Sequence, residues 1–291
     1  MNGIIVINKP KNCTSHDIVA QVKKIVKEKV GHTGTLDPNA TGVLPLLLGK
    51  ATACSKYLIS HDKTYKVLLQ LGKKTDTLDI EGKILEEKEV DLKELTKQKV
   101  EKVFKDLIGK QEQMPPMYSA IKINGKKLYE YARKGEKIEV KPRTIELYSM
   151  KLLKIDEIKK QISFIVSCSK GTYIRSLCEE VAERLNTIGY MQELERTQVG
   201  IFNLENSVTV GELEQNINNV EWLEKNIITV EKFFRKKDKI NLDNRKLQLF
   251  LNGVKLTYKF KDDVYRIYRG SQFIGTGTIE NELLKRDIVV L

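Results

Sequence analysis

Apolar and polar residues in the first part of the chain are spaced as in a strand, a helix and a loop, in that order. Met1 to Pro10 is a short apolar run, which we interpret as the first strand. Thr14 followed by Asp17 is typical of a helix start. Apolar residues then recur at helical spacing: Ile18, Val19, Val22, Ile25 and Val26. Residues 31–42 are rich in glycine, proline and threonine, which predicts a structured loop.

The middle of the chain repeats the alternation of strands and helices. Tyr65 to Leu71 and Ile162 to Cys168 alternate between buried and exposed types, the period of a strand with one buried face. Val100 to Ile108 and Leu177 to Ile188 have the helical period. Three of these elements are followed by a glycine that favours a stop or turn: Gly72, Gly109 and Gly171.

The pattern changes near the C-terminus. Helical spacing over Val210 to Asn226 leads into a basic stretch, and three short strands are then expected: Val264 to Tyr268, Gln272 to Ile279 and Asp287 to Leu291. We therefore predict two domains, a large one over residues 1–235 and a small β-rich one over residues 236–291.

Composition narrows the class of protein. The chain has 291 residues, of which 41% are hydrophobic and 31% charged, values typical of a soluble globular protein. Its apolar runs are shorter than the eighteen or so residues that a membrane span needs. Four cysteines lie far apart without a Cys-x-x-Cys pair, and the three histidines lack metal-ligand spacing. We expect no metal site, free thiols and a cytoplasmic protein.

Charge points to a polyanionic partner. The formal net charge is +12, which attracts nucleic acid because each neutralised phosphate releases counterions. The alternative is a lysine-rich solvated surface, and charge alone does not choose between the two. Residues 122–143 contain three acidic residues, two tyrosines (Tyr129 and Tyr131) and eight basic residues: Lys122, Lys126, Lys127, Arg133, Lys134, Lys137, Lys141 and Arg143. Such a stretch is suited to contact an RNA backbone.

The glycine-rich segments do not have the spacing of nucleotide-binding motifs. Gly42 and Gly49 are too far apart for a P-loop, and Ala51 stands where serine or threonine is needed. The segment Gly275 to Gly277 lacks the third glycine of a dinucleotide fingerprint.

Asp37-Pro38 is a stronger candidate for chemistry. A residue before proline is driven out of the helical region, so the Asp37 carboxylate projects from an extended turn where glycines permit close approach of a substrate. The alternative is an aspartate that only organises its own turn through hydrogen bonds.

A series of motifs in this order resembles the TruB family of tRNA pseudouridine synthases. The series covers most of residues 1–200: Asn8-Lys9-Pro10, residues 31–45 (GHTGTLDPNATGVLP), Lys63-Thr64-Tyr65, Thr75-Asp76-Thr77, residues 115–122 (PPMYSAIK), residues 125–133 (GKKLYEYAR) and residues 170–177 (KGTYIRSL). One short motif often matches by chance, but this long ordered series does not.

The resemblance implies isomerisation of uridine to pseudouridine at position 55 in the tRNA T-loop, without metal or organic cofactor. Asp37 matches the catalytic carboxylate, which forms a covalent adduct or stabilises the sugar cation, two routes that stay open. Tyr65 matches a tyrosine that lies against the base and assists removal of the C5 proton. Arg175 matches the arginine that pairs with the aspartate. From the pattern alone, Tyr65 would be a core residue of a strand and Arg175 a solvated one.

The target uridine is stacked inside the T-loop, so the enzyme must flip it out. By the resemblance, His32 contacts the RNA at the flipped site, and Tyr173 and Leu194 line the substrate pocket. Without it, His32 is a loop histidine and the other two are core residues. At Glu195 the chain departs from the family, which usually has a basic residue there.

The resemblance also implies an α+β fold, with a mixed, largely antiparallel sheet flanked by helices and a small PUA-like β domain at the C-terminus. We expect tRNA, through its T-arm, as the partner of a monomer without an obligate protein partner. Lys122, Lys126, Lys127 and Arg133 are the expected RNA contacts.

Two other functions compete with this one. In an RNA-binding protein or RNA chaperone, Asp37 would be structural, but its occurrence together with Tyr65 and Arg175 argues against that. A carboxylate-dependent nuclease or glycosidase would release uracil or cut the strand, yet the sequence shows no cluster of metal-binding carboxylates.

Overall fold

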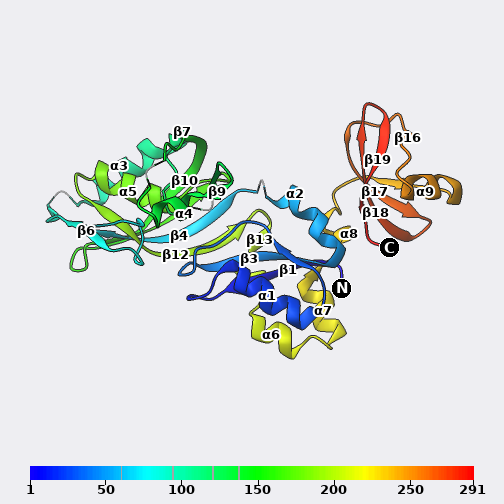
Figure 1. The fold of residues 1–291 in the computed structure, drawn as a ribbon, viewed down its shortest axis with the longest axis horizontal. Coiled ribbons are helices and arrows are strands. Elements are labelled where there is room, and N and C mark those ends of the chain that lie inside the picture. Colours follow the sequence, from blue (N-terminus) through cyan, green and yellow to red (C-terminus); the bar gives the residue numbers. More distant parts are fainter. Residues whose placement is uncertain (60, 94, 120, 137) are drawn as a thin grey trace. The chain divides into compact units, whose positions relative to one another are not determined.

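The computed structural model describes residues 1–59, 61–93, 95–119, 121–136 and 138–291, which form two compact units (Figure 1). Unit 1 consists of residues 1–38, 43–59 and 202–291, and unit 2 of residues 39–42 and 60–201. Ala120 and Lys137, which belong to stretches singled out in the sequence, lie outside the described residues.

The core of unit 2 is an antiparallel sheet with the strand order β12-β4-β11-β10-β7. The two-residue period of the sequence produces this sheet, because every second residue of β4 from Tyr65 and of β11 from Ile162 is buried. Helices α3 and α5 pack on this sheet, and the Phe104 ring of α3 lies 5.1 Å from the Phe164 ring of β11. The elements of unit 2 are β4 (Lys63–Leu71), β5 (Lys73–Thr75), β6 (Ile84–Glu87), α3 (Lys97–Leu107), β7 (Gly109–Gln113), β8 (Lys122–Ile123), β9 (Lys126–Lys127), α4 (Leu128–Ala132), β10 (Arg143–Asp156), β11 (Gln161–Cys168), α5 (Ile174–Arg184) and β12 (Gly189–Val199).

Helix α5 is shorter than its apolar spacing predicts. It ends at Arg184, Leu185 is its C-cap, and Asn186 has a φ of 61°. The prediction that the helix extends to Ile188 was wrong, because a residue in the left-handed region ends the helix. The chain then enters β12 at Gly189.

The part of unit 1 that contains the N-terminus, to which residues 202–233 also belong, is built on β1 and α1. The sequence prediction of a helix start is confirmed, since Thr14 and Asp17 form a capping box in which each side chain accepts from the other residue's backbone N–H. Strand β1 lies between β14 and β3, and α1 packs its apolar side onto them. The elements here are β1 (Gly3–Lys9), α1 (Ser15–Val26), β2 (Val30–His32), β3 (Thr41–Leu48, of which the first two residues belong to unit 2), η1 (Gly49–Cys54), α2 (Ser55–Leu58), β13 (Phe202–Asn203), η2 (Leu204–Asn206), α6 (Val210–Gln215), α7 (Val220–Asn226), β14 (Ile227–Ile228) and α8 (Val230–Phe233).

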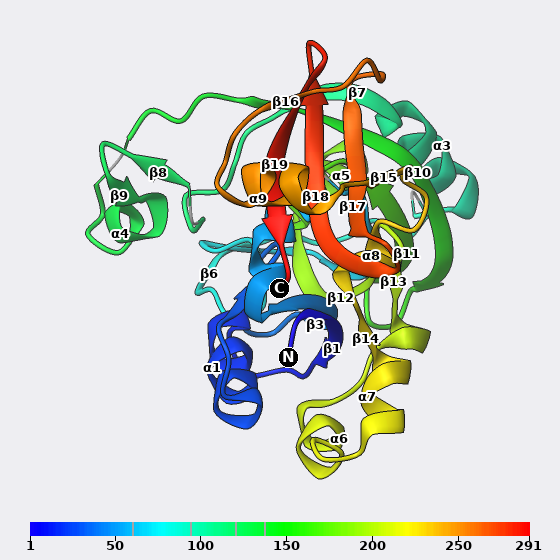
Figure 2. The same cartoon turned by 90° about the vertical axis from the view of Figure 1, so that its right-hand side faces the viewer.

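A second sheet in unit 1 has the order β15-β17-β18-β19-β16, with α9 against it (Figure 2). Its last long strand begins earlier than the sequence pattern predicts, at Leu283 instead of Asp287. Asn281 and Glu282 both have positive φ, as a two-residue hairpin turn requires, so β19 follows β18 at once. The elements are β15 (Lys239–Asn241), α9 (Asn244–Leu251), β16 (Leu256–Thr257), β17 (Asp263–Arg269), β18 (Gln272–Glu280) and β19 (Leu283–Val289).

The predicted fold class is confirmed: the chain is α+β, with a mixed, largely antiparallel sheet, flanking helices and a β-rich C-terminal part that contains a second, smaller sheet. The domain boundary near residue 235 stays a prediction. Among the described residues, no helix is long and apolar enough to cross a membrane.

Candidate active site

The loop of unit 1 that carries Asp37 is held on both sides of this residue. Before it, the buried Ser15 hydroxyl in the first turn of α1 accepts from Leu36 N–H at 2.8 Å and donates to Leu36 C=O at 3.2 Å. After it, the Pro38 carbonyl accepts a hydrogen bond from Lys9 Nζ at 3.0 Å. Asp37 itself is half-buried. The backbone that aims the carboxylate is therefore fixed by side chains from two other elements.

Lys9 is an unusual anchor because its side chain is fully buried. Besides Pro38, its ammonium donates to the carbonyls of Pro10 at 2.8 Å and Cys13 at 2.7 Å. An ammonium carries three N–H donors, and each of the three has a carbonyl here. Buried charges are costly unless their hydrogen bonds are satisfied, so this arrangement ties the end of β1 firmly to the Asp37 loop.

His32 belongs to the same loop. It is the last residue of β2, lies opposite Leu46 of β3 and is half-buried. Its Nε2 lies 3.5 Å from the Thr35 hydroxyl. The structure thus places His32 and Asp37 on one short, anchored segment.

In unit 2, Tyr65 and Leu194 lie on neighbouring strands. Tyr65 of β4 is 7% exposed, and its partner in the register is Arg196 of β12. Leu194, two residues before Arg196, is also 7% exposed and lies opposite Val67. Residues that face each other across a strand pair share a face of the sheet, so Tyr65, Leu194 and Arg196 form one buried cluster. Glu195 lies between them in sequence and opposite Lys66.

Arg196 is held in place from its other side by the segment that follows Asp37-Pro38. Thr41 and Gly42 pair in parallel with Glu195 and Arg196. Gly42 has a φ of 103°, and a Cβ at this position would lie 2.2 Å from the Arg196 carbonyl oxygen. Only glycine allows this close approach of the two backbones.

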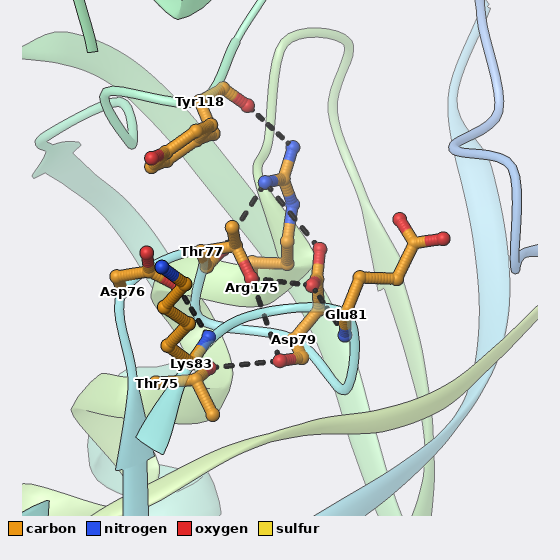
Figure 3. A network of polar contacts seen from close by, with 8 residues as sticks. All are labelled: Thr75, Asp76, Thr77, Asp79, Glu81, Lys83, Tyr118 and Arg175. Carbon is orange, nitrogen blue, oxygen red and sulfur yellow. Dashed lines mark hydrogen bonds and ion pairs between the residues drawn. The ribbon is translucent and has the colours of Figure 1, made fainter. Parts of the chain in front are cut away.

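Arg175 lies at the centre of a polar network, shown in Figure 3. It is 7% exposed in the first turn of α5, where Nη1 donates to Thr77 C=O at 3.2 Å and Nη2 to Tyr118 C=O at 2.9 Å. Its Nη1 also lies 3.6 Å from Asp79 Oδ2. The other oxygen of Asp79 accepts from Thr77 Oγ1 at 2.6 Å and Glu81 N–H at 3.1 Å. The guanidinium is thereby held against residues 75–83 and the segment around Tyr118.

Tyr173 is positioned through its backbone. Its N–H donates to Gln113 Oε1 at 2.8 Å and its carbonyl accepts from Gln113 Nε2 at 3.0 Å, so one side chain satisfies both groups. Gln113 is the last residue of β7 and is buried. This pair locates the N-cap of α5, two residues before Arg175.

The basic stretch of unit 2 carries its charges around tyrosine rings. Lys127 Nζ lies 5.3 Å from the centre of the Tyr129 ring and the Arg133 guanidinium 5.4 Å from the same ring. Lys126 Nζ lies 6.0 Å from the Tyr131 ring. Lys122, Lys126 and Arg133 are exposed and Lys127 is half-buried. Cations and aromatic rings are thus displayed together on a small hairpin and on α4.

Reasoning from the sequence missed four residues of these networks. Ser15 and Asp79 received no role, Lys9 was noted only as part of a motif, and Arg196 was passed over in favour of its neighbour Glu195. Three signals were available: Lys9 stands in the Asn-Lys-Pro motif, Asp79 follows the Thr75-Asp76-Thr77 motif by two residues, and Arg196 belongs to the segment Leu194-Glu195-Arg196-Thr197, which departs from the family only at Glu195. Ser15 had no signal of its own, because a serine after a helix cap is usually exposed.

The comparison with family models decides the family. Residues 23–174 match the TruB family pseudouridylate synthase (N terminal domain), and residues 175–235 match the tRNA pseudouridylate synthase B C-terminal domain. The chain belongs to the TruB family of pseudouridine synthases. These enzymes are isomerases that convert uridine to pseudouridine in tRNA.

Similar proteins agree over the whole length. A tRNA pseudouridine synthase B of Clostridium tetani is 43% identical, covering 98% of both chains, and one of Caldanaerobacter subterraneus is 40% identical with the same coverage. Among solved structures, a Cbf5-Nop10-Gar1 complex contains a chain that is 27% identical with a TM-score of 0.68, covering 99% of this chain and 83% of that one. An H/ACA RNP bound to a substrate RNA containing 2'-deoxyuridine shares the fold, with 24% identity, a TM-score of 0.70 and coverage of 99% and 85%.

Proposed function

We propose that this TruB family enzyme converts uridine 55 in the T-loop of tRNA to pseudouridine, with Asp37 as the catalytic carboxylate. The observation that carries the assignment is the double anchoring of the Asp37 loop by Ser15 and Lys9. An aspartate that served only its own turn would not need a buried lysine and a buried serine on either side of it.

The reaction breaks the C–N glycosidic bond, turns the uracil and rejoins it to the sugar through C5. A carboxylate held at a fixed angle supports this in either of two ways, by adding to the reacting centre or by stabilising the sugar cation while the bond is open. In both cases its position must not drift, since misplacement of about 1 Å lowers the rate strongly.

Tyr65 and Arg175 have the supporting catalytic roles in this proposal. Tyr65 lies against the target base and its hydroxyl assists removal of the C5 proton, a role for which its place on a central strand gives a rigid platform. Arg175 is the arginine that the resemblance pairs with the catalytic carboxylate, and its backbone partners Thr77 and Tyr118 restrict its guanidinium.

The remaining predicted residues bind the RNA. His32 contacts the flipped nucleotide, while Tyr173 and Leu194 line its pocket. Lys122, Lys126, Lys127 and Arg133 contact the T-arm backbone, as their charge and exposure favour. Flipping costs a few kcal/mol, and these contacts supply the binding free energy that offsets it.

The organisation of the protein completes the proposal. Residues 1–235 form the catalytic domain, and residues 236–291 a small PUA-like domain that adds basic surface for tRNA. We infer that the enzyme acts in the cytoplasm as a monomer on the tRNA T-arm, without an obligate protein partner and without metal or organic cofactor.

The test is incubation of the purified enzyme with an unmodified tRNA transcript, followed by base-resolved mapping of pseudouridine. We expect a single modified position, 55, and none in a transcript with cytidine at that position. Free uracil or a cut strand would instead indicate a glycosidase or nuclease. Tight binding without any change in the RNA would indicate an RNA-binding protein.

A further inference from the structure

Arg196 is a buried cation on strand β12 of the unit 2 sheet. Its side chain is 1% exposed and is among the largest of the fully buried side chains. Burial lowers the pKa of Arg196 from its ordinary value, and a hydrogen bond and charge interaction with Tyr65 oppose that shift. Arginine remains charged in proteins, so the fold accepts a costly group at this position.

The Tyr65 phenol is a specific partner for this guanidinium. The two residues are paired in the register of β4 and β12, lie on the same buried face and are joined by a hydrogen bond between their side chains. A guanidinium carries only donors, so the Tyr65 oxygen must be the acceptor. The phenolic hydrogen therefore points away from the guanidinium.

The backbone of Arg196 has little freedom to move away from Tyr65. It is paired with β4 on one side and with Thr41 and Gly42 on the other. The missing Cβ of Gly42 is what permits this packing against the Arg196 carbonyl. The donor is therefore held by the sheet itself and not by a flexible loop.

We propose that Arg196 is a positioning residue for pseudouridine formation, which orients the Tyr65 phenol oxygen and stabilises it as an oxyanion while it takes up the C5 proton. This inference rests on the proposed function. Tyr65 first gives its hydroxyl proton to water, and the resulting phenolate is held by Arg196. The C5–H bond then breaks and a new O–H bond forms on Tyr65. The electron pair of the C5–H bond restores the C5=C6 double bond, while the pair of the C6=N1 bond returns to N1, which takes from water the proton that Tyr65 released.

The role has a physical reason. Oxygen accepts the proton as phenolate, and a phenolate buried beside apolar strands is unfavourable unless a donor or a positive charge compensates it. Arg196 provides both from one rigid group, while its planar N–H pattern also fixes the angle of the phenol C–O bond.

The experiment compares Arg196→Met, Arg196→Lys and a control, Lys66→Met. Lys66 follows Tyr65 directly on β4 but is exposed on the opposite face, so the control removes one positive charge without touching the Tyr65 cluster. The readouts are the single-turnover rate, the Kd for tRNA, and the ¹³Cζ resonance of labelled tyrosine, in which Tyr65 is assigned by its loss in Tyr65→Phe.

We expect Arg196→Met to lower the single-turnover rate about tenfold or more, the value of a charge-assisted hydrogen bond. Its Kd should stay within about threefold of the parent value, since the ring still contacts the base. The Tyr65 resonance should shift in Arg196→Met and return part of the way in Arg196→Lys, together with the rate. Lys66→Met should leave the single-turnover rate and the resonance unchanged.

A parent-like rate in Arg196→Met, or a lowered rate with an unmoved Tyr65 resonance, would overturn the inference. If Arg196→Met does not fold, the same readouts are measured on Arg196→Gln, which keeps an amide donor but no charge. The same two outcomes would then overturn the inference. The proposed function fails separately, when the parent enzyme makes no pseudouridine in tRNA. In that case the tyrosine resonances still show whether Arg196 orients Tyr65.

Discussion

Replacing Asp79 with asparagine tests whether the network in Figure 3 serves catalysis. Asparagine has nearly the same shape as aspartate but no charge. One of its side-chain atoms can still accept from the Thr77 hydroxyl and the Glu81 N–H. The other, an NH₂ group, then faces Arg175 Nη1, 3.6 Å away in the parent protein, where two donors confront each other.

The loss of stability in Asp79→Asn follows from the burial of the ion pair between Arg175 and Asp79. The side chains of Arg175 and Asp79 are 8% and 11% exposed, so solvent screens them little. Removing one partner of a buried ion pair costs about 3–5 kcal/mol. Arg175 keeps its bonds to the Thr77 and Tyr118 carbonyls, which reduces the expected loss of stability to about 1–3 kcal/mol. If a similar amount is lost from the placement of Arg175 in the transition state, the rate falls about tenfold to a hundredfold.

The assay measures the single-turnover rate, tRNA Kd and Tm of Asp79→Asn and of a matched control, Asp76→Asn. Asp76 belongs to the same loop and accepts from Lys83 N–H at 2.8 Å. It is therefore matched to Asp79 in charge and in bonding to the loop backbone. We expect Asp79→Asn to lower the Tm by several degrees and the rate as calculated, with Kd little changed, and Asp76→Asn to alter the rate much less.

Two results would refute this reasoning. If Asp79→Asn loses stability but turns over like the parent enzyme, the ion pair only holds the loop against α5. If Asp76→Asn and Asp79→Asn slow the reaction equally, loop geometry and not the charge beside Arg175 is responsible.

Three further predictions concern the proposed roles directly. Asp37→Asn should abolish pseudouridine formation while tRNA affinity, measured by filter binding, stays within a few-fold, and any turnover by the purified variant contradicts the assignment of Asp37 as the catalytic carboxylate. Tyr65→Phe should bind tRNA and isomerise it very slowly, whereas Tyr65→Leu should lose both; parent-like turnover of Tyr65→Phe would leave the ring as a platform only. Replacing Lys126, Lys127 and Arg133 together with alanine should weaken tRNA binding and flatten its salt dependence by about one log-log unit for each lost phosphate contact. The rate at saturating tRNA should change little, and an unchanged affinity and salt slope would mean a merely solvated face.

Local features of the molecule could be predicted from the sequence because they depend on neighbours in the chain. The capping box of Thr14 and Asp17 acts over three residues, and the alternation in β4 and β11 follows from the two-residue period of a strand. The ordered motifs around Asp37 and Tyr65 identified the family for the same reason, since they are read along the chain.

Only the tertiary structure decided which side chains meet. The hydrogen bond from Lys9 to Pro38 spans 29 residues and that from Arg175 to Thr77 spans 98, while Arg196 reaches Tyr65 through the register of two strands. Such contacts depend on the pairing of β4 with β12, on the approach that Gly42 allows and on the anchoring of the Asp37 loop. A one-residue shift in register would turn Arg196 to the other face of the sheet. The sequence by itself therefore determined the elements and the family, and the packing of distant segments determined which charged groups surround the residues that we propose for catalysis.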